Sequence, residues 1–178
     1  MIDFIYGNDI INLTIIGGGN ITMKLLHKLG LFLIICMVGF FVTGCGEKNI
    51  EGELDELMTK VYSQLPEDKT PMGLTNIEVN AENVEGYLGT ADIEYKEALA
   101  SESQTGSIAH SVVLVRVEDE SKVEEVMAQI KDNVNPRKWI CVGVEEDQVI
   151  VKNKGNLIIL IMAADGAEEL EAGFDGLE

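Results

Sequence analysis

The segment VIVKNKGNLIILIMAADGAEELEAGF, residues 149–174, decides the fold of this chain of 178 residues. Two runs of β-branched and aliphatic residues flank Lys154-Gly155, a pair typical of a tight turn between antiparallel strands. The second run, LIILIM (157–162), is apolar at every position, whereas a strand with one face in water alternates apolar and polar residues. We therefore expect a hairpin whose second strand lies centrally in a sheet.

A helix is predicted directly after this strand. Leu170, Phe174 and Leu177 recur at the spacing of one helix face, and Asp165 and Glu168 stand where a capping box begins a helix. A helix with one apolar face must bury that face against another element. The hairpin and the closing helix together predict a sheet covered by helices.

Two helices are predicted near the start of this domain. The first runs from Glu53 to Pro66, and the second is capped by Asn80 and closed by Gly89. Residues 66–76 between them read as a loop, because proline, glycine and polar residues dominate there. The apolar stripe of the first helix consists of Leu54, Leu57, Met58, Val61 and Leu65.

A further helix is predicted in the middle of the domain. Ser121 and Glu124 form a candidate capping box, and Asn135-Pro136 ends the pattern. Its apolar stripe consists of Val123, Val126, Met127, Ile130 and Val134.

Strands account for most of the remaining apolar residues. Residues 101–106 read as a turn, and the acidic turn Glu145-Glu146-Asp147 predicts a second hairpin. The predicted strands are residues 91–100, 107–118, 139–145, 148–153 and 156–163. The fold class is therefore α+β, a small and mainly antiparallel sheet of about five strands with helices packed on it. Residues 108–145 would form a right-handed strand–helix–strand crossover if both of their strands share the sheet.

An uncharged apolar run of 18 residues, 29–46, precedes this domain and follows Lys24 and Lys28. Basic residues, an apolar stretch and then small residues are the layout of a secretory signal. The run ends in Val42-Thr43-Gly44-Cys45, which resembles the cleavage motif, or lipobox, of bacterial lipoproteins. That resemblance implies that Cys45 carries lipid as the mature N-terminus. The alternative is an uncleaved transmembrane helix, since the run is just long enough to span a bilayer.

Four segments follow from this interpretation: residues 1–22, a leader that we expect to arise from an over-extended start; 23–44, the signal peptide; 45–52, a lipidated tether; and 53–178, one α+β domain. The glycines 17–19 do not begin a dinucleotide-binding loop, because Thr22 stands where the third motif glycine belongs. The signal layout is complete from Met23.

Charge is distributed very unevenly along the chain. The net charge is −18, and residues 1–44 contribute nothing to it, because Asp3 and Asp9 balance Lys24 and Lys28. A domain this acidic repels phosphate backbones, so we expect no nucleic-acid partner. We expect the partners to be the membrane, through the lipid anchor, and an unidentified protein of the cell envelope.

Residues that carry chemistry are sparse in the domain. Cys141 is the one cysteine after Cys45, and its apolar neighbours predict a buried, inert thiol. His110 has no partner residues at metal-ligand spacing and is read as a structural histidine. We therefore expect no catalytic residues, no metal and no cofactor, with weak calcium binding by the acidic turns as an alternative.

Trp139 is the sole tryptophan, and Arg137 and Lys138 precede it. Core packing at the start of a strand is one interpretation of this residue. The other is a contact site for a partner, because tryptophan and arginine are enriched in the central residues of protein interfaces. Arg137, Lys138 and Trp139 are the candidate contact residues.

The run from Met72 to Leu177 resembles a family of small bacterial lipoproteins whose domain has no assigned function. The matching pieces are NAENVEGYLG, SVVLVRVEDESKVEEVMAQIKDNV and the segment 149–174 quoted above. The resemblance implies a lipid-anchored α+β domain and supplies no catalytic or binding residues. Around NPRKWICV (135–142) the chain departs from the family pattern.

These observations predict a lipoprotein on the outer face of a cell membrane that acts as a non-enzymatic binding or accessory domain. Two alternatives stay open at this point. One is an enzyme that uses carboxylates, which the acid-rich turns would permit. The other is an accessory subunit of an envelope complex.

Overall fold

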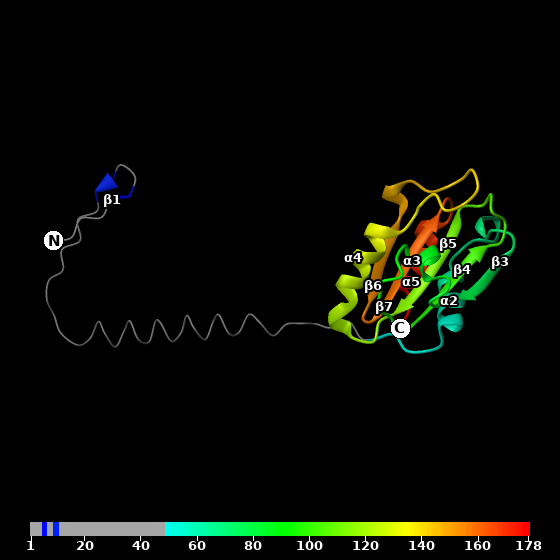
Figure 1. Ribbon diagram of the computed structural model, residues 1–178, viewed down its shortest axis with the longest axis horizontal. Helices are drawn as coiled ribbons and strands as arrows, with labels where there is room; N and C mark the ends of the chain where they lie inside the picture. The colour runs from blue at the N-terminus through cyan, green and yellow to red at the C-terminus, as the bar shows by residue number, and fades with distance from the viewer. Residues whose placement is uncertain (1–4, 7–8, 11–48) are drawn as a thin grey trace. The chain divides into compact units, whose positions relative to one another are not determined.

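A five-stranded antiparallel sheet with strand order β3-β4-β5-β7-β6 forms the centre of the domain (Figure 1). The strands are β3 (Leu74–Glu78), β4 (Glu97–Ser103), β5 (His110–Arg116), β6 (Ile150–Lys154) and β7 (Leu157–Ala163). The structure, a computed structural model, describes residues 5–6, 9–10 and 49–178. It confirms the predicted α+β class.

Residues 1–45 and 46–178 are separate units. Of the first unit, the structure describes two short paired strands, β1 (Ile5–Tyr6) and β2 (Asp9–Ile10). Within the described residues, no helix combines the length and the apolar character needed to cross a bilayer. The apolar run 29–46 lies outside the described residues.

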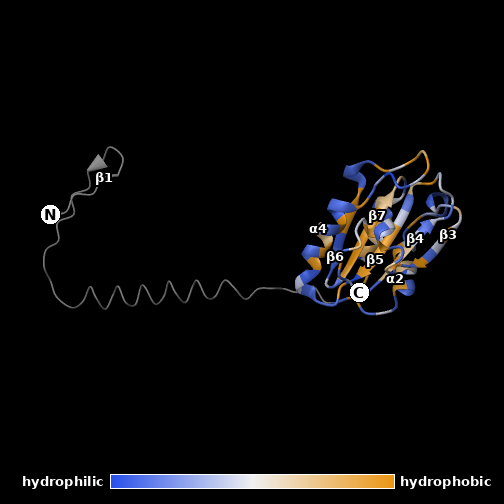
Figure 2. Cartoon of the chain, viewed as in Figure 1, coloured by the Kyte–Doolittle hydropathy of each residue, from blue (hydrophilic) through white to orange (hydrophobic). Residues whose placement is uncertain are grey.

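Helices cover both faces of the sheet. On one face α2 (Leu54–Tyr62) and α5 (Ala167–Asp175) share an apolar core with alternate residues of β5 and β7, including Leu114 and Ile159. On the other face α3 (Val84–Leu88) and α4 (Val123–Asn133) pack on the intervening residues, including Val113 and Leu160. Figure 2 shows the result as apolar strands inside a polar shell of helices.

Residues 157–162 are apolar throughout because helices bury both faces of β7. Every residue of β5 and β7 is buried, and β5 lies between β4 and β7 in the sheet. The predicted hairpin is also present, since β6 and β7 pair antiparallel around Gly155, whose φ of 55° is left-handed.

The sheet has two distinct ends. We call the end formed by Glu97, Arg116 and Leu157 the near end, because the chain joins the domain there: the Asn156 amide donates to Asn49 Oδ1 at 3.0 Å. The opposite end, formed by Ser103, His110 and Ala163, is the far end. Strands of seven residues separate the two ends by about 20 Å.

The predicted strand 139–145 is wrong. Instead this segment folds back on itself: the Val144 amide donates to the Pro136 carbonyl at 2.9 Å, and the Ile140 amide donates to Gly106 at 2.8 Å. Gly143 lies so close to Pro136 that an added Cβ would come within 2.8 Å of its carbonyl oxygen. Amides used in this way cannot join a ladder, so Glu145-Glu146-Asp147 begins no hairpin and the predicted 108–145 crossover is absent.

The fifth strand comes instead from the predicted loop 66–76. Leu74 pairs with Ser103, and Glu78 with Leu99, so β3 forms one edge of the sheet. An edge strand buries little, and three of the five β3 residues are exposed, which explains the weak apolar pattern. The neighbouring strand β4 also begins and ends later than predicted, at 97 and 103.

The predicted helices are present, and Gly89 ends α3 as predicted, but the predicted N-terminal caps are wrong. α3 begins after Asn83, while Asn80 Oδ1 accepts from the Glu82 amide instead. A 3₁₀ turn precedes α4, and there Asp119 takes the capping role predicted for Ser121. Gly166, which has a left-handed φ, precedes α5 as its N-cap, and no side chain caps the helix there, so Asp165 and Glu168 are not a capping box.

Candidate functional site

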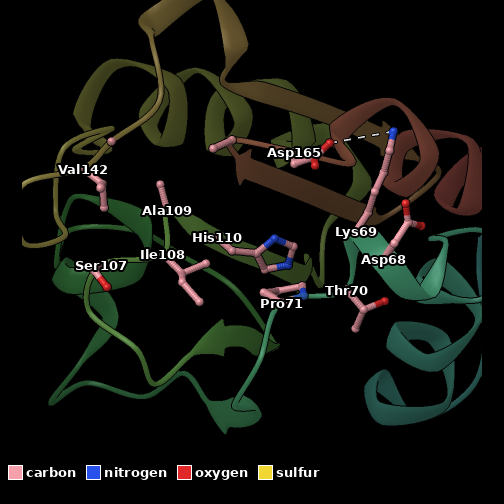
Figure 3. A pocket seen from close by; sticks show the side chains of 12 residues that line it. Asp68, Lys69, Thr70, Pro71, Ser107, Ile108, Ala109, His110, Val142 and Asp165 are labelled. Carbon is pink, nitrogen blue, oxygen red and sulfur yellow. Dashed lines mark ion pairs between the residues drawn. The ribbon is translucent and has the colours of Figure 1, made fainter.

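A pocket of about 470 Å³ opens at the far end of the sheet (Figure 3). Four segments that are distant in sequence form its lining: residues 68–71 after α2, 107–110 at the start of β5, 142–143 in the loop after α4, and 164–165 after β7. The sheet therefore brings these segments together, and no single stretch of sequence marks the site.

His110 lies at the bottom of this pocket. It is the first residue of β5 and is 2% exposed, and its Nε2 lies 2.7 Å from the Tyr62 hydroxyl on α2. Burial lowers the pKa of His110 to about 4 and raises that of Tyr62 to about 12, although a hydrogen bond with Ser101 opposes the shift of the tyrosine. Both side chains are therefore uncharged at neutral pH.

The second nitrogen of the His110 ring remains available. Among the described residues, Nδ1 makes no hydrogen bond, yet it is not one of the fully buried atoms that lack a partner. His110 is one of the lining residues of the pocket, and Nδ1 can donate or accept a hydrogen bond depending on the tautomer. In Figure 3 the imidazole projects toward the segment that carries Thr70 and Pro71.

Charged side chains gather on one side of the pocket. Lys69 Nζ lies 2.6 Å from Glu169 and 3.8 Å from Asp165, and Asp68 adds a third carboxylate. The hydrogen bond between Lys69 and Glu169 raises the pKa of the lysine and lowers that of the glutamate. One cation thus faces three anions.

Two exposed apolar side chains flank the pocket. Met72 (77% exposed) comes directly after the lining residue Pro71 in the sequence. Ile140 (72% exposed) comes two residues before the lining residue Val142. They are the large apolar side chains that stay exposed in the part of the chain that the structure describes. Such groups beside a hollow are typical of binding surfaces.

The predicted contact residues Lys138 and Trp139 lie nearby but point inward. Lys138 Nζ and Trp139 Nε1 each lie 3.0 Å from Glu102 Oε1 on β4. The ammonium also lies 4.5 Å from the centre of the Tyr87 ring, a favourable cation–π distance. Burial lowers the pKa of Lys138, and Glu102 opposes this shift.

These contacts fasten the loop after α4 to the sheet. Arg137 is different, since it is exposed and pairs with the equally exposed Glu145 at 3.0 Å. The structure therefore places Lys138 and Trp139 in a half-buried cluster with Glu102 and leaves Arg137 on the surface. A second pocket, of about 600 Å³, lies beside this cluster, and Lys138 is one of its lining residues.

Cys141 is exposed, so the predicted burial of its thiol is wrong. It lies in the folded-back loop and has a left-handed φ of 62°. The predicted lipidation motif, Val42-Thr43-Gly44-Cys45, lies outside the described residues. Within residues 49–178 and the two short strands of the first unit, no three His, Cys, Asp or Glu side chains gather closely enough to hold a metal ion.

Sequence reasoning missed most of the pocket. The sequence predicts only a loop for residues 66–76 and places Ile140 in a strand. The one available signal was His110, a histidine in an otherwise apolar strand. Its role depends on Tyr62, which lies 48 residues earlier in the chain.

Comparison with known proteins gave no match: no family model, curated protein or solved structure matches this chain. The resemblance to a lipoprotein family therefore stays a prediction. Any functional conclusion must come from the residues themselves.

Proposed function

We propose that this chain is a lipid-anchored protein of the outer face of a cell membrane that acts by binding a ligand or partner, without catalysis. The anchor rests on the sequence before the domain: two lysines, an uncharged apolar run and then Val42-Thr43-Gly44-Cys45. Two acyl chains on Cys45 would hold the protein stably, whereas one chain binds a bilayer only marginally.

One observation carries the proposal. The chain joins the near end of the sheet at Asn49, four residues after Cys45. Four residues span at most about 14 Å, so a lipidated Cys45 would keep the near end close to the bilayer. The pocket, Met72 and Ile140 belong to the far end, about 20 Å away along the strands.

The pocket chemistry supports binding over catalysis. A general acid or base works best when its pKa lies near the working pH. The pKa of His110 is about 4 and that of Tyr62 about 12, so neither group exchanges a proton readily at neutral pH. Moreover, the two side chains are hydrogen-bonded to each other.

Replacing the anchor residue tests the proposal. Cells that express the full chain are fed an alkyne analogue of palmitate, and the protein is then isolated and its acylation measured. We expect Cys45→Ser to lose all label, because serine has no thiol to form the thioether. Cys36→Ser and Cys141→Ser, which change the other two cysteines, should keep it. Acylation of the Cys45→Ser protein would contradict the anchor.

The exposed thiol of Cys141 tests the location in the same cells. A membrane-impermeant maleimide is applied to spheroplasts or protoplasts whose inner membrane is intact. It should label the wild-type protein and should not label Cys141→Ser. Labelling that requires lysis of the inner membrane would contradict an extracytoplasmic domain.

A further inference from the structure

We propose that the far-end pocket binds a small organic ammonium ion whose apolar body lies between the pocket walls. This inference names the class of ligand and rests on the proposed function only in that the domain acts by binding. Three features of the pocket lead to it: its walls, its charges and its floor.

The walls are apolar and the space suits a small molecule. Pro71, Ile108 and Val142 come from three different segments and line a volume of about 470 Å³. Ligand pockets of small molecules commonly fall between about 300 and 1,000 Å³ and are mostly apolar. The exposed apolar residues Met72 and Ile140 lie close in sequence to the lining residues Pro71 and Val142.

The charges favour a cation. Asp68, Asp165 and Lys69 all line the pocket. The Lys69 ammonium is hydrogen-bonded to Glu169 at 2.6 Å and lies 3.8 Å from Asp165. The surroundings therefore hold an excess of negative charge even after Lys69 is counted. An anionic ligand would be repelled by these carboxylates, and an ammonium ion attracted, at an effective dielectric constant typical of protein surfaces.

The floor does not oppose this charge. His110 is uncharged at neutral pH and 2% exposed, and its free Nδ1 can bond a polar group of the ligand. We infer that the ammonium group lies on the carboxylate side and the apolar body above His110.

Three probes of matched shape test the charge preference: phenethylamine, phenethyl alcohol and phenylacetate. The full chain in phosphatidylcholine nanodiscs is titrated with each, and the side-chain methyl signals of Ile108 and Met72 are followed by NMR. Met127 on α4, which is not one of the lining residues of the pocket, is the internal reference. We expect phenethylamine to bind about tenfold more tightly than phenylacetate, the alcohol lying between them.

Two variants test the place of binding. Ser107→Trp adds bulk to an exposed lining residue and should abolish the shifts. Asp68→Asn/Asp165→Asn should weaken phenethylamine about fivefold, because contacts between exposed charges are weak. Glu146→Gln/Asp147→Asn removes the same charge from an acidic turn outside this pocket and should change the affinity less than twofold.

Equal or tighter binding of phenylacetate would overturn the ligand class. Binding that survives Ser107→Trp, or the absence of shifts with all three probes, would overturn the site. Neither result bears on the anchor, because the acylation of Cys45 is measured separately. Conversely, if the acylation experiment shows that Cys45 carries no lipid, the titration is still expected to give the same result.

Discussion

The near end and the far end of the sheet are formed by the same three strands but use polar side chains differently. At the near end, Arg116 is 8% exposed; it pairs with Glu97 and donates to the Gly52 carbonyl at 2.8 Å. Asn49 donates to Glu120 at 2.6 Å and accepts from Asn156. These bonds join the beginning of the domain to strands that lie far along the chain.

At the far end the contacts are arranged around an opening. His110 is bonded on one side and free on the other, and the apolar side chains of Met72 and Ile140 face outward. One end therefore holds the chain where it enters the domain, while the other end leaves polar and apolar groups available to a ligand or partner. This division fits a domain anchored at one end that binds at the other.

The largest expected effect is at the near end. Arg116→Ala should lower the free energy of unfolding by about 3 kcal/mol, because it removes a nearly buried guanidinium with two partners. The cost lies at the lower end for buried pairs, since Glu97 is partly exposed and Arg116 Nε has no partner. Urea denaturation followed by circular dichroism measures the change.

Arg137 at the far end is the matched control. It is exposed and pairs only with exposed Glu145, so Arg137→Ala should change the same free energy by about 0.5 kcal/mol or less. Equal costs for the two arginines would contradict the difference that we draw between the ends.

The interior could be predicted from the sequence because its pattern is strong. The apolar residues of 157–162 and the stripes of α2, α4 and α5 each identified a buried face, and residues such as Leu57, Ile130 and Phe174 are fully buried. Periodicity reports burial directly, so the sheet-and-helix class followed from it.

The loops and caps could not be predicted in this way. WICVGV (139–144) is apolar like a strand, but Gly143 permits a close approach to Pro136 that turns the segment back. The predicted cap of α5 is wrong for a similar reason. Gly166 has a left-handed φ of 77°, so the chain turns into the helix without a side-chain hydrogen bond. Tertiary contacts of this kind leave little trace in local composition.

The site was predictable only in part. Arg137, Lys138 and Trp139 are the predicted contact residues, and the structure shows that Lys138 and Trp139 also contact Glu102 on β4. The pocket depends on four segments brought together by the sheet, among them the loop before an edge strand that the pattern did not reveal. A single sequence contains no signal for such a juxtaposition.

The burial of His110 should make the folded protein less stable at acidic pH. Its pKa is about 4 in the folded protein and 6.5 when exposed, so below pH 6.5 the unfolded chain takes up a proton that the native state excludes. This contribution to stability is complete above pH 6.5 and is lost as the pH falls toward 4. Between pH 7 and pH 5 the loss should be about 2 kcal/mol, measured by urea denaturation at each pH.

His110→Asn provides the control, because asparagine keeps a polar group at this position and does not titrate. The variant should be less stable at pH 7 and should lose about 2 kcal/mol less than the wild type on going to pH 5. Parallel pH profiles for the two proteins would show that His110 titrates normally in the folded state.

The smallest expected effect concerns two ion pairs near the far end, one half-buried and one exposed. Lys138 and Glu102 are 14% and 16% exposed, whereas Arg137 and Glu145 are 66% and 70% exposed. A double-mutant cycle with Lys138→Met and Glu102→Gln should give a coupling of about 1 kcal/mol, since the charges are largely shielded from water and Lys138 also contacts Tyr87.

The matching cycle on the exposed pair, Arg137→Met with Glu145→Gln, should give a coupling of only a few tenths of a kcal/mol. If both pairs couple equally weakly, the Lys138–Glu102 ion pair does not hold the loop on β4. The loop would then be held by the Trp139–Glu102 hydrogen bond and by the backbone contacts with Gly106 and Pro136. If the inner pair couples as we expect, one wall of the pocket is held by an ion pair about as strongly as a good hydrogen bond holds other parts of a protein.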